Sequence, residues 1–113
     1  MDDCIFCKIV RGDFGTTFVA ENELAVAFDD IAPIAPVHTL VVPRRHIESL
    51  ADITAQDSDL VTACILLANE VAKVKGVDQS GYRTGTNVGP DAGQSVFHLH
   101  FHVFGGKRLS GEG

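Results

Sequence analysis

The stretch that decides the fold is "SVFHLHFHVFGG", residues 95–106, in which histidine occupies every second position of an apolar run. Side chains alternate between the two faces of a β-strand. A strand here places His98, His100 and His102 on one face and the apolar residues that alternate with them on the other. The apolar face belongs to a core. The opposite face presents three imidazoles, whose particular assets are proton transfer, nucleophilic attack and metal binding near neutral pH.

Two uses of such a face are open from the residues alone. Histidines two positions apart can chelate a catalytic Zn²⁺ that keeps one position free for an activated water. Alternatively, one histidine attacks phosphorus as a nucleophile while its neighbours orient it and move protons. The loop before the strand, "NVGPDAGQS" at residues 87–95, offers Asn87, Gln94 and Ser95 as donors beside two glycines. That composition is typical of an anion-binding loop as well as of an ordinary hairpin loop.

The rest of the chain predicts an α+β fold with a five-stranded antiparallel sheet, one long helix and a short N-terminal helix. "CIFCKIVRG", residues 4–12, is expected to form the short helix, and apolar residues three and four apart predict the long helix over 54–75, with Thr54 and Asp57 as a capping box. Turn signals separate the β-type runs, and the prolines of residues 31–36 predict a surface loop. The predicted strands are residues 16–21, 24–30, 38–43, 81–89 and 95–104.

Composition limits the class of protein. With 113 residues, 45% of them hydrophobic, and a mean hydropathy of +0.15, the chain suits one domain spanning residues 1–113. The net charge of -6 argues against broad binding to a nucleic-acid backbone. No apolar run approaches the ~20 residues that cross a bilayer, and the first residues are acidic, unlike a signal peptide. We therefore expect a cytoplasmic protein without a membrane partner.

The three cysteines favour metal ligation over a disulfide framework. Two residues separate Cys4 from Cys7. Two thiolates need two more ligands to close a tetrahedral zinc site. The candidates for these two further ligands are His38, His46 and one histidine of the 95–106 stretch. The third cysteine lies on the apolar face of the predicted long helix, where a small buried hydrophobic residue is expected.

The residues of "HLHFHVF", 98–104, resemble the His-x-His-x-His signature of the histidine-triad (HIT) nucleotide-binding proteins. The resemblance extends to residues 4–12, 27–47 and 81–106 and is strongest to the Hint-like branch. It implies a HIT domain whose sheet continues across a homodimer. It also implies a purine nucleoside monophosphate or its phosphoramidate as ligand, and a purine nucleoside phosphoramidase that works through a nucleotidyl-histidine intermediate.

The resemblance assigns catalytic roles to three histidines. It makes His100 the nucleophile, His102 the residue that binds phosphate and assists proton transfer, and His38 a supporting histidine near the nucleophile. It gives Asp30 the ribose hydroxyls, while core packing is an equal alternative for the apolar members of the set. The implied nucleotide-binding residues are Phe6, Ile9, Phe28, Asp30, Ile31, Asn87, Gly93, Gln94, Ser95, His100 and His102.

Zinc-containing relatives imply a structural Zn²⁺ held by Cys4, Cys7, His46 and His98, and no catalytic metal. The tail "GGKRLSGEG", residues 105–113, lacks the Trp-Pro-Pro ending of the animal members, which leaves the leaving-group preference open. Three other functions remain alternatives at this point: a nucleotide-binding or scaffold protein with little turnover, a dinucleoside polyphosphate hydrolase, and a hydrolase with catalytic zinc.

Overall fold

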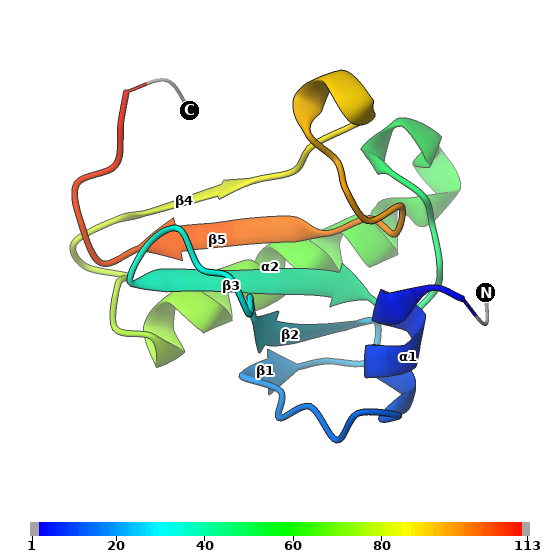
Figure 1. The fold of residues 1–113 in the computed structure, drawn as a ribbon, viewed down its shortest axis with the longest axis horizontal. Coiled ribbons are helices and arrows are strands. Elements are labelled where there is room, and N and C mark those ends of the chain that lie inside the picture. Colours follow the sequence, from blue (N-terminus) through cyan, green and yellow to red (C-terminus); the bar gives the residue numbers. More distant parts are fainter. Residues whose placement is uncertain (1–2, 112–113) are drawn as a thin grey trace.

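The computed structural model describes residues 3–111 and builds one antiparallel five-stranded sheet, with a long helix behind it and a short helix in front (Figure 1). Neighbouring strands follow the order β1-β2-β3-β5-β4, so β1 and β4 are the two edges. The predicted α+β fold with five antiparallel strands and two helices is confirmed. The strands are β1 (Ala20–Glu21), β2 (Ala25–Asp29), β3 (Val37–Pro43), β4 (Tyr82–Gly85) and β5 (Phe101–Gly105).

The two helices begin and end at residues suited to those places. Helix α1 (Ile5–Arg11) ends at Gly12, whose φ of 88° is a left-handed conformation that glycine adopts without strain. Helix α2 (Ser58–Val74) follows a 3-10 turn in which Thr54 and Asp57 form the predicted capping box. The short 3-10 turns are η1 (Leu50–Asp52), η2 (Ala55–Asp57) and η3 (Pro90–Ala92). Within residues 3–111, no helix is long and apolar enough to span a membrane.

The main core lies between α2 and the sheet. The residues that α2 contributes to this core follow helical spacing and so lie on one face of the helix. Residues of β2, β3 and β5 pack against that face from the sheet. Truncating a fully buried leucine such as Leu67 to alanine costs about 2–5 kcal/mol in a core of this kind. The cluster comprises Ala25, Ala27, Val41, Leu60, Cys64, Leu67, Ala68, Val71, Leu99, Phe101 and Val103. Its cysteine is the small buried hydrophobic residue that the sequence predicted.

The opposite face of the sheet is only partly covered. Phe6 of α1 packs there on a second cluster that contains Val26, Phe28, Leu40 and Val42. Helix α1 lies near the end of the sheet where β3 finishes (Figure 1). The remainder of this face carries the histidines of β3 and β5, so the incomplete cover leaves room for a site.

The predicted fifth strand is too long at its start. A strand over 95–104 was expected, but β5 begins at Phe101. The register that pairs Val41 with Phe101 would place Leu99 opposite Pro43, which has no N–H to donate. The Leu99 N–H instead donates to the Ile47 carbonyl at 2.6 Å. Segment 95–100 therefore lies outside the ladder.

Candidate active site

The three histidines of the triad keep to one side of the chain although only the last lies within β5. Leu99, whose side chain points the other way, is buried in the main core. The ring centroids of His100 and His102 are 5.1 Å apart, and Phe6 contacts His100 at the same centroid distance. The Thr86 hydroxyl donates to the His100 carbonyl at 2.7 Å and replaces a ladder bond. Side-chain bonds thus hold the segment extended where the sheet has ended.

The environment of His100 fixes which ring nitrogen is free. Its Nδ1 lies 2.7 Å from the backbone carbonyl of His98, which can only accept a hydrogen bond. Nδ1 therefore carries the proton, and Nε2 keeps its lone pair. His100 is only 7% exposed, and the rings of Phe6 and His102 both pack edge to face with it. This arrangement suits a nitrogen nucleophile.

His102 forms a hydrogen-bonded pair with His38 from β3. The Ile34 N–H donates to His38 Nδ1 at 3.2 Å, so the proton of the neutral His38 ring is on Nε2. That Nε2 lies 2.9 Å from His102 Nδ1 and 3.4 Å from an Asp30 carboxylate oxygen. His102 Nδ1 accepts the hydrogen bond, which leaves Nε2 of His102 with a proton to donate.

Burial keeps this histidine pair neutral. The pKa of His102 is lowered to about 4, chiefly by burial and also by the nearby His100 and His38 rings, while Asp30 opposes the shift. Burial also lowers the pKa of His38, and the negative charge of Asp30 opposes that shift. At neutral pH both rings of the free protein are therefore uncharged.

A second cluster joins α1 to the start of the triad. His98 Nδ1 lies 3.4 Å from Cys4 Sγ and 3.5 Å from Cys7 Sγ, and His46 Nδ1 lies 3.4 Å from Cys7 Sγ. Sulfur and nitrogen ligands of a tetrahedral Zn²⁺ are about 3.5 Å apart, given Zn–S near ~2.3 Å and Zn–N near ~2.0 Å. All four ligand atoms lie within 4.8 Å of one another. The four residues therefore fit a zinc ion.

The second nitrogen of His98 supports the same assignment. Its Nε2 lies 2.9 Å from the Pro43 carbonyl and must carry the proton, so Nδ1 presents a lone pair to the two sulfurs. Burial lowers the pKa of His98, while the hydrogen bond to Pro43 opposes that shift. Neutral imidazole is the form that binds a metal. This cluster could hold a metal such as zinc. Of the three triad histidines it includes only His98, so His100 and His102 are not part of it.

The proposed base-binding residues differ in their accessibility. Phe6 and Phe28 are buried and meet edge to face at 5.6 Å, and Ile9 packs against their cluster half-buried. Ile31, by contrast, is fully exposed. Asp30 accepts a hydrogen bond from the Ala32 N–H at 2.8 Å with its other carboxylate oxygen. The structure thus brings Phe6 against His100 and Phe28 against Phe6, but leaves Ile31 exposed to solvent.

The glycine-rich loop is held in shape by Gln94. Its side chain accepts from the Gly89 N–H at 2.9 Å and donates to the carbonyls of Glu48, at 2.7 Å, and Val96, at 3.1 Å. Gln94 is only 5% exposed, so its polar atoms serve the loop. Gly93 adopts a left-handed φ of 82° at the end of η3. Of the three predicted donors in this loop, Asn87 and Ser95 are exposed and Gln94 is buried.

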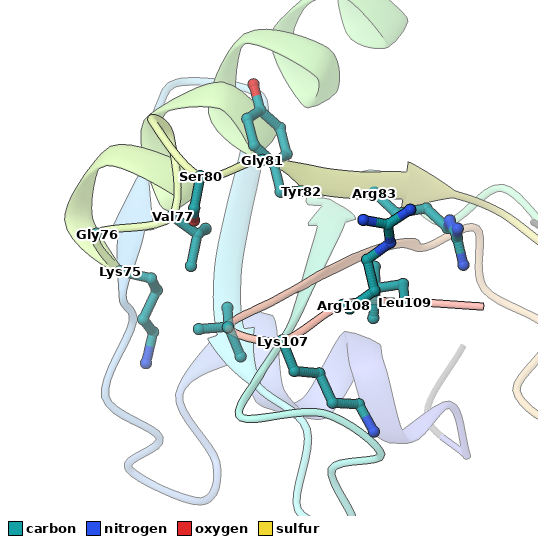
Figure 2. Close-up of a pocket in the computed structure, with 12 residues that line it drawn as sticks. Lys75, Gly76, Val77, Ser80, Gly81, Tyr82, Arg83, Lys107, Arg108 and Leu109 are labelled. Atoms are coloured by element: carbon teal, nitrogen blue, oxygen red, sulfur yellow. The ribbon is translucent and has the colours of Figure 1, made fainter. Parts of the chain in front are cut away.

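One feature of the site was missed by the sequence analysis. A cavity of about 820 Å³ borders His38 and His102, and Arg83, Lys107 and Arg108 line it as well. The same three cations line a neighbouring cavity of about 720 Å³ at the end of α2, which Figure 2 shows. The adjacent Lys and Arg at 107–108 were the available signal, but nothing in the sequence placed them beside a histidine of β3.

Comparisons with known proteins agree with this geometry. A family model described as HIT domain matches residues 11–109. A histidine triad protein from Clostridium difficile is 46% identical and superposes with a TM-score of 0.92, covering 97% of this chain and 96% of that one. A HIT family hydrolase from Clostridium thermocellum is 39% identical, with a TM-score of 0.94 over the same shares of the two chains.

A named enzyme is also similar to this chain. The purine nucleoside phosphoramidase of Escherichia coli K12 is 34% identical over 108 residues, which are 96% of this chain and 91% of that protein. The match of the family model over nearly the whole sequence, and the similarity to these relatives, show that the chain belongs to the HIT domain family.

Proposed function

We propose that this protein is a hydrolase of purine nucleoside phosphoramidates that works through a covalent nucleotidyl-histidine intermediate at His100. The observation that carries the proposal is the 2.7 Å contact between His100 Nδ1 and the His98 carbonyl, which leaves Nε2 unprotonated. The similarity to the phosphoramidase of Escherichia coli supports the substrate class. Phe6 lies against the nucleophile, and the half-buried Ile9 on the same aromatic cluster supplies apolar surface for a purine.

In the first step, the lone pair of His100 Nε2 attacks the phosphorus. A bond between phosphorus and Nε2 forms as the bond between phosphorus and the amine breaks. Positive charge develops on the His100 ring, and the His98 carbonyl stabilises it through the Nδ1 hydrogen bond. The same carbonyl also prevents the ring from turning away from the phosphorus.

His102 supplies the proton that the departing amine needs. In the free protein its pKa is about 4, and the negative charge of a bound phosphoryl group raises that pKa. The resulting imidazolium gives its proton to the leaving nitrogen. Water then attacks the phosphorus, the neutral His102 accepts its proton, and the bond to Nε2 breaks to release the nucleoside monophosphate.

His38 and Asp30 position His102 for both steps. In the free protein, where the His102 ring is neutral, its Nδ1 accepts from His38 Nε2 at 2.9 Å, and this contact orients the ring so that Nε2 of His102 faces the reaction. Asp30, 3.4 Å from His38, opposes the loss of positive charge from this pair. A carboxylate can also accept ribose hydroxyls, which supports Asp30 as the ribose contact.

A Zn²⁺ held by Cys4, Cys7, His46 and His98 would be structural, because four protein ligands leave no open position. It would tie α1, and with it Phe6, to the segment that carries His100. We also place the whole chain in one HIT domain. The free thiols of the three cysteines support a reducing compartment such as the cytoplasm.

A homodimer completes the proposal. Strand β4 is an edge of the sheet, and apolar side chains of α2 and β4 remain exposed, namely Ile65, Leu66, Val74 and Tyr82. A second copy that pairs along this edge would cover them. Light scattering after size exclusion tests the dimer, and a monomer at micromolar concentration contradicts it.

The decisive experiment measures AMP release from a fluorogenic adenosine phosphoramidate by the wild type and by His100→Ala. We expect the variant to lose about three orders of magnitude or more in kcat, since the nucleophile is removed. Circular dichroism controls for folding, and mass spectrometry of a rapidly quenched reaction checks for a nucleotidyl adduct on His100. An inert wild type that AMP still stabilises against heat would make the protein a nucleotide-binding module instead.

A further inference from the structure

The cavity beside His102 differs in charge from the rest of the molecule. The protein carries a net charge of -6, yet Arg83, Lys107 and Arg108 line this cavity and no lining residue is acidic. Its remaining lining is mostly apolar or neutral and includes Ile34 and Phe104. The cavity is therefore a local positive region within an acidic protein.

These three cations have no carboxylate partner among the described residues. Arg44, Arg45 and Lys75 each form an ion pair with a carboxylate. Among residues 3–111, none of Arg83, Lys107 and Arg108 forms such a pair; Arg83 instead donates to the Ser110 carbonyl at 2.6 Å. Their charge is thus available to an anion that enters the cavity.

The position of the cavity relates it to the proposed reaction. Phe6 lies against His100, whereas the cavity borders His102 and His38 and includes neither Phe6 nor His100. A purine packed on the aromatic cluster and a phosphorus at His100 would leave the third part of the substrate, the departing group, directed past His102. That is also the residue that gives the departing group its proton.

We propose that this cavity receives the leaving group, and that Arg83, Lys107 and Arg108 select leaving groups with a negative charge, such as an amino acid that is joined to phosphorus through its amine and keeps its carboxylate free. The inference rests on the proposed function and specifies its substrate class. The carboxylate would accept charge-assisted hydrogen bonds from the cations. The bond changes are those described above, and the product is the free amino acid.

The neighbouring cavity at the end of α2 extends the positive region. Lys75, Arg83, Lys107 and Arg108 all border it, and Figure 2 shows these side chains around the opening. Lys75 is bound to Asp29 at 2.9 Å, so its charge is already balanced. The selective contribution is therefore expected from the three unpaired cations, and Lys107 and Arg108 are the pair that can be changed without breaking a backbone hydrogen bond.

The test compares two adenosine phosphoramidates, one of alanine with its free carboxylate and one of alaninamide, which is neutral. The two amines differ in basicity, so the quantity of interest is the ratio of kcat/KM for the two substrates in each protein. The double variant Lys107→Gln with Arg108→Gln removes two charges. Lys73→Gln is the control for the loss of a positive charge elsewhere on the surface, because Lys73 is an exposed lysine outside both cavities.

We expect the double variant to lower the ratio of kcat/KM for the anionic substrate to kcat/KM for the neutral substrate by about tenfold, which equals about 1.4 kcal/mol. Lys73→Gln should leave the ratio unchanged. The preference of the wild type should also decline with rising sodium chloride, because two of the three cations are exposed and screened. AMP has no leaving group, so its affinity should change less than twofold in the double variant.

Several outcomes would overturn the inference. If the double variant slows both substrates equally, or if AMP affinity falls as much as kcat/KM, the cations serve the nucleotide and not the leaving group. If both substrates are cleaved and the double variant has the same ratio of kcat/KM values as the wild type, the charge selection is refuted but the proposed hydrolase activity stands. If neither substrate is cleaved, the proposed hydrolase activity fails, and the inference fails with it.

Discussion

Protonation of His102 should make the folded protein less stable in mild acid. The pKa of this ring is about 4 in the folded chain, below the ordinary value of 6.5. Between pH 6.5 and pH 4 the unfolded chain therefore binds a proton at this residue that the folded chain does not bind. The contribution is fully present above about pH 6.5, is lost as the pH falls through this window, and changes no further below about pH 4.

The size of the effect follows from the two pKa values. The gap between 6.5 and about 4 corresponds to about 3.4 kcal/mol at ~1.36 kcal/mol for each pKa unit. His102 is only half-buried, so solvent screening reduces this to about 1–2 kcal/mol. Carboxylates and other histidines titrate in the same range, and for this reason a matched variant is needed.

His102→Asn provides that comparison. An asparagine amide oxygen can still accept from His38 Nε2 but has no proton to gain in acid. Urea unfolding at pH 7.5 and at pH 4.5 gives the free energy of unfolding of both proteins. The wild type should lose about 1–2 kcal/mol more than the variant on acidification. Equal losses in the two proteins, or an NMR titration that gives His102 a pKa near 6.5, would refute the reasoning.

Three further predictions concern the metal cluster, the main core and one turn. Cys7→Ser should abolish tight zinc binding, measured as zinc content after dialysis, while Cys64→Ser should retain the zinc of the wild type. Cys64→Ser should nevertheless lower the free energy of unfolding by about 1–3 kcal/mol, because it buries a hydroxyl in an apolar cluster; unchanged urea unfolding would contradict this. Gly106→Ala should cost about 1–3 kcal/mol, since φ is +89° and the new Cβ would lie 2.8 Å from Pro36 Cβ. Gly111→Ala meets nothing within 4 Å and should be neutral, and urea unfolding of the two variants beside the wild type checks both expectations.

The strands and the long helix could be predicted because their signals are local. Runs of β-type residues bounded by turn signals and prolines marked β2 and β3, helical spacing marked α2, and the capping box at Thr54 was readable from residues three apart. The start of β5 could not be predicted, because it depends on Pro43, more than fifty residues away in the sequence, which stops the ladder. Side chains of residues 98–100 still point alternately to the two sides, because hydrogen bonds to Ile47 and Thr86 hold this segment extended outside the sheet.

The site was predictable to a similar degree. The HIT signature grouped the triad, and the geometry brings Cys4, Cys7, His46 and His98 together as the resemblance implied. The tautomers were not predictable, because backbone groups such as the His98 carbonyl decide them. The basic cavity was also hidden, since Arg83 and residues 107–108 come from separate segments that meet only in the folded chain.

The pairing of β3 with β5 has a consequence for biosynthesis. The hydrogen bond between His38 and His102 joins residues 64 positions apart, so β3 is synthesised well before its partner β5. Strands β1 to β3 and helix α2 can emerge and begin to fold while the last strand is still unmade. Until β5 inserts between β3 and β4, the centre of the sheet is open and exposes unpaired edges. A nascent or truncated chain that lacks β5 therefore lacks His102, the proposed proton donor, and presents unpaired strand edges that favour aggregation.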